Sequence, residues 1–197
     1  MKAIFHLLCI SLLASCSSGI GYKEYFNFFN QFDEGSSMVF VDGDITYSLQ
    51  FRPAEFLALN HIKSDSEINA DKISKTISDY EQGLNFCLRI SSVKNEDILD
   101  LNTKDKGEYY GRIAMLNVDF PRLIAGISKK DTMRCQIHHY ERTYKVQPFV
   151  QVLFNIKSNK ENLPENVVFY DDIFNEGKKI EFKNFKEYYS NLPKLNI

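Results

Sequence analysis

The chain has 197 residues and carries 24 Lys and Arg against 26 Asp and Glu, which gives a formal net charge of −2. This balance lacks the basic excess that is typical of nucleic-acid-binding proteins, so no nucleic-acid partner is expected. A hydrophobic content of 44% with 25% charged residues suits an ordinary globular protein, and 16 Phe and 11 Tyr supply side chains for a core and for sheets.

The first element in chain order is a secretory leader. Met1-Lys2 supplies one positive charge, and an almost uninterrupted apolar run covers residues 3–14. A positive start, a short apolar segment and small residues at its end form the pattern of a signal peptide. The run is too short for a transmembrane helix, which needs about 20 apolar residues. We therefore expect residues 1–15 to be removed from the mature protein.

The leader ends in the sequence Leu13-Ala14-Ser15-Cys16, an aliphatic residue and two small residues before a cysteine. This segment resembles the lipobox of bacterial lipoproteins. The resemblance implies cleavage just before Cys16, a diacylglyceryl group on its sulfur and acylation of the new amino group. Two or three acyl chains hold a protein stably at a bilayer, whereas one chain holds it marginally. We therefore expect a lipid anchor at Cys16, a tether over residues 16–21 and a single globular domain over residues 22–197.

The cysteine count supports lipidation over the alternative, an ordinary signal peptide that leaves a chance cysteine behind. Cleavage before Cys16 removes Cys9, and the lipid occupies Cys16, so Cys87 and Cys135 remain. An even number of cysteines suits an oxidising compartment. Each of the two lies in a predicted strand, so they can form a disulfide only if those strands are neighbours in the sheet. A disulfide and two buried free thiols both fit the sequence.

Residues 22–32 predict an amphipathic helix directly after the tether. Aromatic residues recur there at helical spacing, at positions 22, 25, 26, 29 and 32. One interpretation places this helix at the bilayer interface, and the other places it over the sheet of its own domain. Interfacial helices carry many Lys and Arg residues on their polar face. This helix lacks them, which favours the second interpretation.

The clearest local prediction is a hairpin around Asp42-Gly43. The pair lies between strand-like runs at residues 38–41 and 44–51, and glycine tolerates the positive φ of a type I′ turn. A two-residue turn at this pair places Phe40 opposite Ile45. One face of the hairpin is then apolar and the other polar, as in an antiparallel sheet with one buried face.

The remaining chain predicts an α+β fold with a mainly antiparallel sheet and a few covering helices. We expect helices over residues 53–60 and 66–82, and a strand over residues 84–90, where apolar residues alternate with polar ones. Residues 93–107 are expected to form a connector. Further strands are expected over residues 109–118, 133–142, 145–157, 167–170 and 179–182, and short helices over residues 121–128 and 185–192.

No catalytic or metal-binding motif stands out in the sequence. His138 and His139 are candidates, but adjacent strand residues point to opposite faces of a sheet, so their rings would not share one metal ion. Residues 100–104 match the start of a calcium loop, but Lys104 takes a ligand position and Asp105 stands where glycine is required. We therefore predict no catalytic residue, no metal site and no cofactor.

These patterns predict a lipid-anchored lipoprotein of the cell envelope. Its domain is expected to be a non-enzymatic binding or structural module whose partner is another envelope protein or polymer. One alternative is an anchored periplasmic hydrolase that uses His138 or His139 with an acid, which requires a concave pocket. Another is a carrier of small ligands, which requires an enclosed apolar cavity. Ser17 follows the lipidated cysteine, and in the enteric sorting pattern such a residue goes with the outer membrane. We therefore expect the domain to face the periplasm from that membrane.

Overall fold

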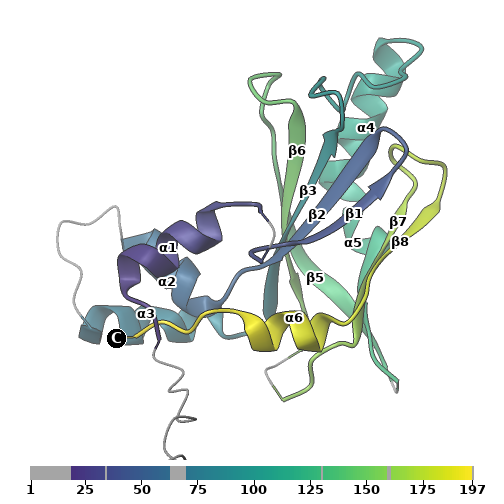
Figure 1. Cartoon of the computed structure of the whole chain (residues 1–197). Helices are drawn as coiled ribbons and strands as arrows, with labels where there is room; N and C mark the ends of the chain where they lie inside the picture. Colours follow the sequence, from purple (N-terminus) through teal and green to yellow (C-terminus); the bar gives the residue numbers. More distant parts are fainter. Residues whose placement is uncertain (1–18, 34, 63–69, 130, 159–160, 197) are drawn as a thin grey trace, which may run out of the picture.

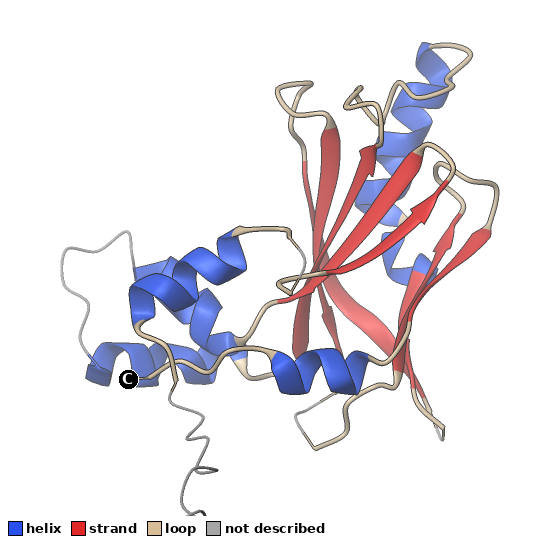
Figure 2. Cartoon of the chain, viewed as in Figure 1, coloured by secondary structure: helices blue, strands red, loops and turns tan. Residues whose placement is uncertain are grey.

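The computed structural model describes residues 19–33, 35–62, 70–129, 131–158 and 161–196. The helices are α1 (Tyr22–Asn30), α2 (Ala54–Ile62), α3 (Ala70–Tyr80), α4 (Lys106–Val118), α5 (Phe120–Leu123) and α6 (Phe185–Asn191). The strands are β1 (Met38–Asp42), β2 (Ile45–Phe51), β3 (Leu84–Ser92), β4 (Ile124–Ile127), β5 (Thr132–Glu141), β6 (Phe149–Ile156), β7 (Asn166–Asp171) and β8 (Lys178–Phe182). The predicted α+β class with an antiparallel sheet is confirmed (Figure 2).

The eight strands form one antiparallel sheet in the order β1-β2-β3-β6-β5-β4-β7-β8. The sheet curls until its two edge strands, β1 and β8, approach each other, so its shape is nearly that of a barrel (Figure 1). Polar contacts fix this closing edge. Asn175 Nδ2 donates a hydrogen bond to Asp42 Oδ2 at 2.7 Å, and Lys178 Nζ lies 3.4 Å from Asp42 Oδ1.

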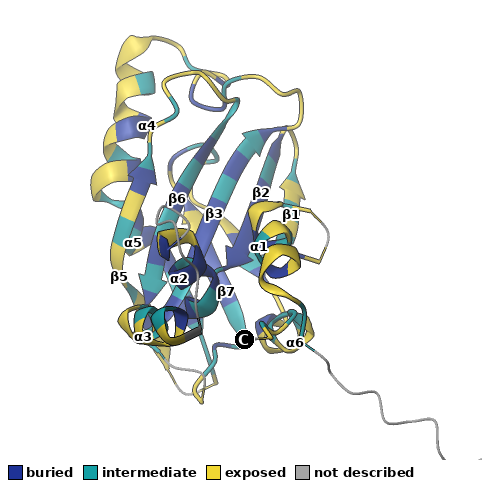
Figure 3. Ribbon diagram, turned by 90° about the vertical axis from the view of Figure 1, so that its left-hand side faces the viewer, coloured by how far each residue is buried: buried dark blue, intermediate teal, exposed yellow. Residues whose placement is uncertain are grey.

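The interior of the curled sheet is filled by the apolar residues that alternate along each strand. On β3 these are Leu84, Phe86, Leu88 and Ile90, all buried as the alternation predicts (Figure 3). Phe120 from α5 enters the same core, with its ring centroid 5.5 Å from that of Phe154 and 5.9 Å from that of Phe169. Large aromatic side chains therefore occupy the space that a wider barrel would leave open.

A second, smaller core joins α1, α2 and α3 beside the sheet. Its buried members are Tyr25, Phe29, Phe56, Leu59, Ile62 and Ile73. The predicted helix over residues 22–32 is thus confirmed as α1, and it buries its aromatic face within its own protein. Contacts with the outer face of the sheet hold this layer in place, since Gln50 Nε2 donates to the Gln31 carbonyl at 2.7 Å. None of the helices among the described residues has the length and apolarity that a bilayer crossing requires.

The described chain begins and ends at the same place. Ile20 forms an isolated parallel bridge with Leu195, in which Ile20 N donates to the Lys194 carbonyl at 2.9 Å and Asn196 N donates to the Ile20 carbonyl at 3.0 Å. This bridge lies at the end of the molecule that carries α1, α3 and α6, and the tip of the β5–β6 hairpin lies at the other end (Figure 1).

The prediction of a strand over residues 109–118 is wrong, because this segment belongs to helix α4. Its Tyr, Ile and Val residues favour strands. Asp105, however, caps the helix with its side chain, which accepts a hydrogen bond from Glu108 N at 2.9 Å. Arg112, Ile113 and Leu116 then form the buried face at helical spacing. The spacing of an acidic cap and Glu108 three residues later was the sequence signal for this helix.

Two further predictions need correction. The expected helix over residues 121–128 is limited to α5, and β4 occupies residues 124–127.

The hairpin predicted around Asp42-Gly43 is present, but its two-residue turn is Gly43-Asp44, so Phe40 pairs with Tyr47. The positive φ of 55° falls on Gly43 at the first turn position, as in a type II′ turn. A shift of two residues preserves which side chains share a face, so the predicted buried face is correct.

Candidate functional site

An open cleft of about 530 Å³ lies at the end of the molecule that carries the β5–β6 hairpin tip. Three segments form it: the turns that precede α4, the first turn of α4, and the hairpin tip. Its volume falls within the range of about 300–1,000 Å³ that is usual for ligand pockets. The cleft therefore has the size of a binding site, and its position is remote from the bridge between Ile20 and Leu195.

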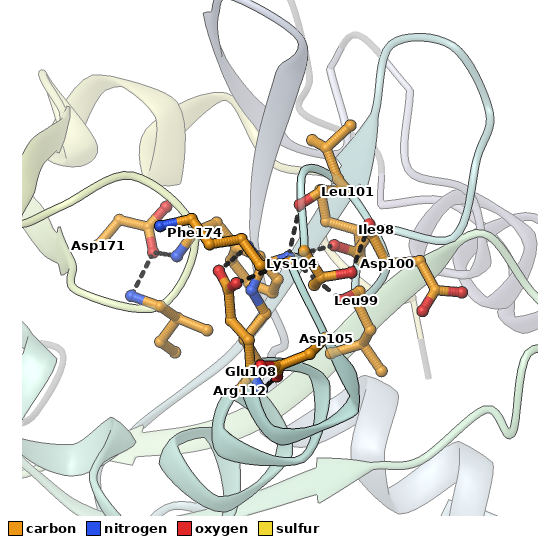
Figure 4. A network of polar contacts seen from close by, with 12 residues as sticks. Ile98, Leu99, Asp100, Leu101, Lys104, Asp105, Glu108, Arg112, Asp171 and Phe174 are labelled. Carbon is orange, nitrogen blue, oxygen red and sulfur yellow. Dashed lines mark hydrogen bonds and ion pairs between the residues drawn. The ribbon is translucent and has the colours of Figure 1, made fainter.

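A buried arginine holds the turns that form one wall of the cleft. Arg112 of α4 is only 6% exposed. Its Nη1 donates to the carbonyls of Ile98, Leu99 and Leu101 at 3.3, 3.1 and 2.7 Å (Figure 4). Its Nη2 contacts Glu108 Oε1 at 3.2 Å. The Ile98 carbonyl also accepts from Leu101 N at 3.3 Å. For the carbonyls of Leu99 and Leu101 the guanidinium replaces the hydrogen bonds of regular structure, and it thereby fixes the wall to the helix.

The opposite wall is a hairpin tip with an unusual backbone. Val146 N donates to the Thr143 carbonyl at 2.9 Å, so Tyr144 and Lys145 are the central residues of a four-residue turn. Both have positive φ angles, 50° and 63°, as in a type I′ turn. Such positions favour Asn and Gly, and the left-handed conformation costs other residues roughly 1–2 kcal/mol each. Strain of this kind clusters at functional sites, and both side chains line the cleft.

The charged side chains of the cleft are four cations and two carboxylates. Lys145 Nζ lies 2.5 Å from Asp100 Oδ2, and this hydrogen bond raises the pKa of Lys145. Three other cations line the cleft and are exposed: Lys104, Lys106 and Arg142. Within the described part of the chain, no carboxylate forms an ion pair with any of these three side chains. The cleft therefore has uncompensated positive charge in a protein whose net charge is negative.

Three tyrosines supply the apolar surface of the cleft, namely Tyr109, Tyr110 and Tyr144. Tyr109 and Tyr110 meet edge to face, with ring centroids 5.4 Å apart. The cations lie over the rings: Lys145 Nζ is 4.9 Å from the Tyr109 centroid, and the Arg142 guanidinium is 4.7 Å from that of Tyr144. Burial raises the pKa of Tyr109. The three tyrosines therefore present rings and hydroxyl groups together in the cleft.

A second cavity of about 500 Å³ lies between α1, the start of α2 and the segment after α6. Tyr25, Glu55 and Tyr189 are among its lining residues. It is more apolar than the cleft and borders the bridge between Ile20 and Leu195. Glu55 and Lys194 are its charged lining residues in the described part of the chain, so it has less charge there than the cleft has.

The two histidines considered from the sequence lie apart from both cavities. His138 Nε2 is 2.9 Å from the Asn117 carbonyl, and its ring stacks on Phe120 with a centroid distance of 5.7 Å. His139 is exposed on the other face of β5. The prediction that the two rings point to opposite faces is therefore confirmed. In the part of the chain that the structure describes, no group of three or more His, Cys, Asp or Glu residues could hold a metal ion.

The disulfide considered between Cys87 and Cys135 is not formed, and both thiols are free in the structure. Strand β6 lies between β3 and β5, so the required neighbouring strands are absent. The two thiols also lie on opposite faces of the sheet. Cys87 alternates with the inward-facing Phe86, whereas Cys135 pairs with the inward-facing Ile156 and contacts the core.

The remaining sequence predictions concern Cys16 and the segment compared with a calcium loop. Cys16 lies outside the described residues, so its lipidation stays a prediction. The rejected calcium loop proves to be part of the cleft wall, where Asp100 pairs with Lys145 and Asp105 caps α4. The tyrosines and the hairpin cations of the cleft were not among the residues predicted from the sequence. The strands expected over residues 133–142 and 145–157 do pair, as β5 and β6. The signal for the site was the Tyr144-Lys145 pair in the turn between them, where Asn-Gly is usual.

Comparison with known proteins adds no relative, since no protein-family profile, no curated protein and no solved structure matches this chain.

Proposed function

We infer that this protein is a lipid-anchored lipoprotein of the cell envelope whose domain is a non-enzymatic binding module. One observation carries the binding role: an open cleft with uncompensated cations and exposed tyrosines lies at the end of the molecule opposite Ile20. Ile20 follows Cys16 by four positions in the sequence. A domain anchored there would direct its cleft away from the membrane surface and toward other envelope components.

The geometry gives less support to the two alternatives. A hydrolase that uses His138 or His139 needs one of them in a pocket with an acid, and neither lines the cleft or the second cavity. A carrier of small apolar ligands needs an enclosed apolar cavity. The interior of the sheet is instead packed with aromatic rings, such as Phe86 stacked on Phe154 at a centroid distance of 5.2 Å.

The anchor is tested by the substitution Cys16→Ser, with Cys9→Ser as the matched control in the leader. We expect the Cys16→Ser protein to leave the membrane fraction or to accumulate unprocessed, and the Cys9→Ser protein to behave as the wild type. The outer-membrane placement is read from the same cells by density-gradient separation of the two membranes. A Cys16→Ser protein that matures and sediments with membranes as before would refute the anchor.

The binding role is tested in intact cells by a photo-crosslinking amino acid placed at Val146, beside the cleft, and in a second strain at Tyr170 on β7. Both side chains are exposed, so the insertions should not disturb the core. A binding module is expected to give a discrete crosslinked neighbour from one or both positions. Absence of any crosslinked neighbour from either position would contradict the binding role while leaving the anchor untouched.

A further inference from the structure

The free functional groups of the cleft restrict what it can bind. Asp100 is already in an ion pair and Asp105 already caps α4, so both carboxylates are engaged. Lys104, Lys106 and Arg142 have no acidic partner among the described residues. Ammonium and guanidinium groups only donate hydrogen bonds. A ligand of this cleft must therefore supply acceptors, and a negatively charged acceptor is favoured over a neutral one.

Apolar surface surrounds these cations. Tyr110, Tyr144 and Val146 are 59%, 72% and 83% exposed, although large apolar side chains are usually covered. Tyr and Arg are enriched in the residues that dominate protein–protein binding energy, because they offer large contact areas and directed hydrogen bonds. Cations beside exposed aromatic and aliphatic groups match a partner that combines carboxylates with apolar side chains.

We propose that the cleft binds an acidic segment of another protein chain, in which Asp or Glu residues alternate with apolar ones. This assignment rests on the binding role proposed above and names its ligand class. The carboxylates pair with Lys104, Lys106 and Arg142, and the apolar side chains pack on Tyr110, Tyr144 and Val146. The strained turn at Tyr144 and Lys145 holds the two side chains in place before the partner arrives, which lowers the ordering cost of binding.

A phosphate-bearing polymer is the competing ligand class, and two observations disfavour it. The protein as a whole is negatively charged, so a long polyanion would be repelled by the surface outside the cleft. Such a polymer also offers few apolar groups to cover Tyr144 and Val146. An acidic protein segment satisfies both the charges and the apolar surface.

The direct test is fluorescence anisotropy with the full lipidated chain in detergent. The probe is a short labelled peptide of alternating Glu and Phe separated by Gly and Ser, and the matched peptide carries Gln in place of Glu. We expect the Glu peptide to bind and the Gln peptide to bind at least about tenfold more weakly, since two or three charge-assisted contacts are lost. Unlabelled inorganic polyphosphate is added as a competitor in a third arm.

The variants Lys106→Gln with Arg142→Gln remove two cleft cations, and Lys183→Gln with Lys186→Gln remove two exposed cations near α6. The substitutions in the cleft should lower the affinity for the Glu peptide about tenfold and make that affinity less dependent on salt. The control substitutions should leave the affinity unchanged. Circular dichroism spectra of both variants check that they fold alike.

Three results would overturn the inference: equal binding of the Glu and Gln peptides, equal loss in the two variants, or binding of polyphosphate with no binding of the Glu peptide. The crosslinking experiment separates this failure from failure of the binding role. A neighbour captured from Tyr170 but not from Val146 would refute the cleft as the site and leave a binding module elsewhere on the surface.

Discussion

The hydroxyl group of Tyr47 donates a hydrogen bond of 2.5 Å to Asp171 Oδ2 across the interior of the curled sheet. The two residues lie on β2 and β7, the second and seventh strands of the sheet order, and are separated by 124 positions in sequence. Asp171 Oδ1 in turn accepts from the backbone N–H groups of Ile173 and Phe174 at 3.0 and 2.9 Å (Figure 4). This pair therefore connects the two ends of the sheet where no backbone ladder does.

Removing the Tyr47 hydroxyl tests this connection. Tyr47→Phe should lower the free energy of unfolding by about 1.5–3 kcal/mol, because the lost hydrogen bond involves a charged acceptor in a buried site. Urea unfolding followed by circular dichroism measures the change. Tyr170→Phe, at a half-exposed position on β7, is the control and should be nearly neutral. Equal stability of the wild type and Tyr47→Phe would show that the bond contributes nothing net.

The carboxyl group of Asp171 should make stability depend on pH. Burial raises its pKa above the ordinary value of 3.8, although Tyr47, the two backbone N–H groups and Arg112 oppose the shift. The folded state therefore binds this proton more tightly than the unfolded chain does. Its stabilising contribution is complete below the unfolded pKa and is lost as the pH rises through the folded pKa.

We expect Asp171→Asn to abolish that decline, since the amide does not titrate and its oxygen can still accept from the backbone. Unfolding midpoints in urea, measured from about pH 4 upward, should fall with pH in the wild type more than in the variant. The exposed Asp172→Asn controls for the change in net charge. Parallel pH profiles for all three proteins would contradict the prediction.

Arg112→Met should be strongly destabilising, because the three carbonyls that Arg112 satisfies belong to buried residues. A loss of about 3 kcal/mol is expected, because the buried carbonyls of Leu99 and Leu101 lose the donor that Arg112 supplies. The same change should loosen the cleft wall and weaken the Glu peptide. Arg122→Met, at an exposed site, is the matched control. A variant that keeps both stability and peptide binding would exclude Arg112 as the support of this wall.

Tyr144→Gly should raise stability and reduce binding. Glycine adopts the positive φ at this position without strain, so a gain of about 1 kcal/mol is expected. The lost ring should weaken the Glu peptide. Glu176→Gly is the control, because Glu176 has a φ of 46° in the β7–β8 turn, outside the cleft. Its stability should rise similarly without any change in peptide affinity. Stronger peptide binding by Tyr144→Gly would contradict the role of this side chain.

The two thiols should resist alkylation in the native protein. Burial raises the pKa of Cys87 to about 12 and that of Cys135 to about 11, and only the thiolate reacts. Mass spectrometry after iodoacetamide treatment should show neither cysteine modified in native protein and both modified after unfolding, with no reductant added. If denatured, unreduced protein resists alkylation until a reductant is added, the two cysteines are bonded after all.

The alternation of apolar and polar residues was enough to predict β3 and the buried face of the β1–β2 hairpin, because a period of two dictates the inward set. It failed for α4, where Tyr109, Ile113 and Val118 suggested a strand. The side chain of Asp105 accepts a hydrogen bond from an exposed N–H group at the start of the helix and so stabilises the helix. Local propensity alone could not weigh this capping contact.

The cleft was beyond prediction for a different reason. Its residues come from positions 100–110 and 142–145. Arg112 holds the turns before α4, and Lys145 joins the hairpin tip to Asp100 in those turns. Arginine is rarely buried, so nothing in the sequence marks Arg112 as a support. The disulfide question was equally undecidable, since the position of β6 between β3 and β5 follows from the pairing order of the whole sheet.

The bridge between Ile20 and Leu195 also determines how the molecule responds to mechanical force. A pull on the residues before Ile20 loads two backbone hydrogen bonds first, and next the short helix α1. The curled sheet bears tension only after that helix has been peeled away. The terminal bridge and α1 should therefore unfold first under force, while the cleft keeps its shape.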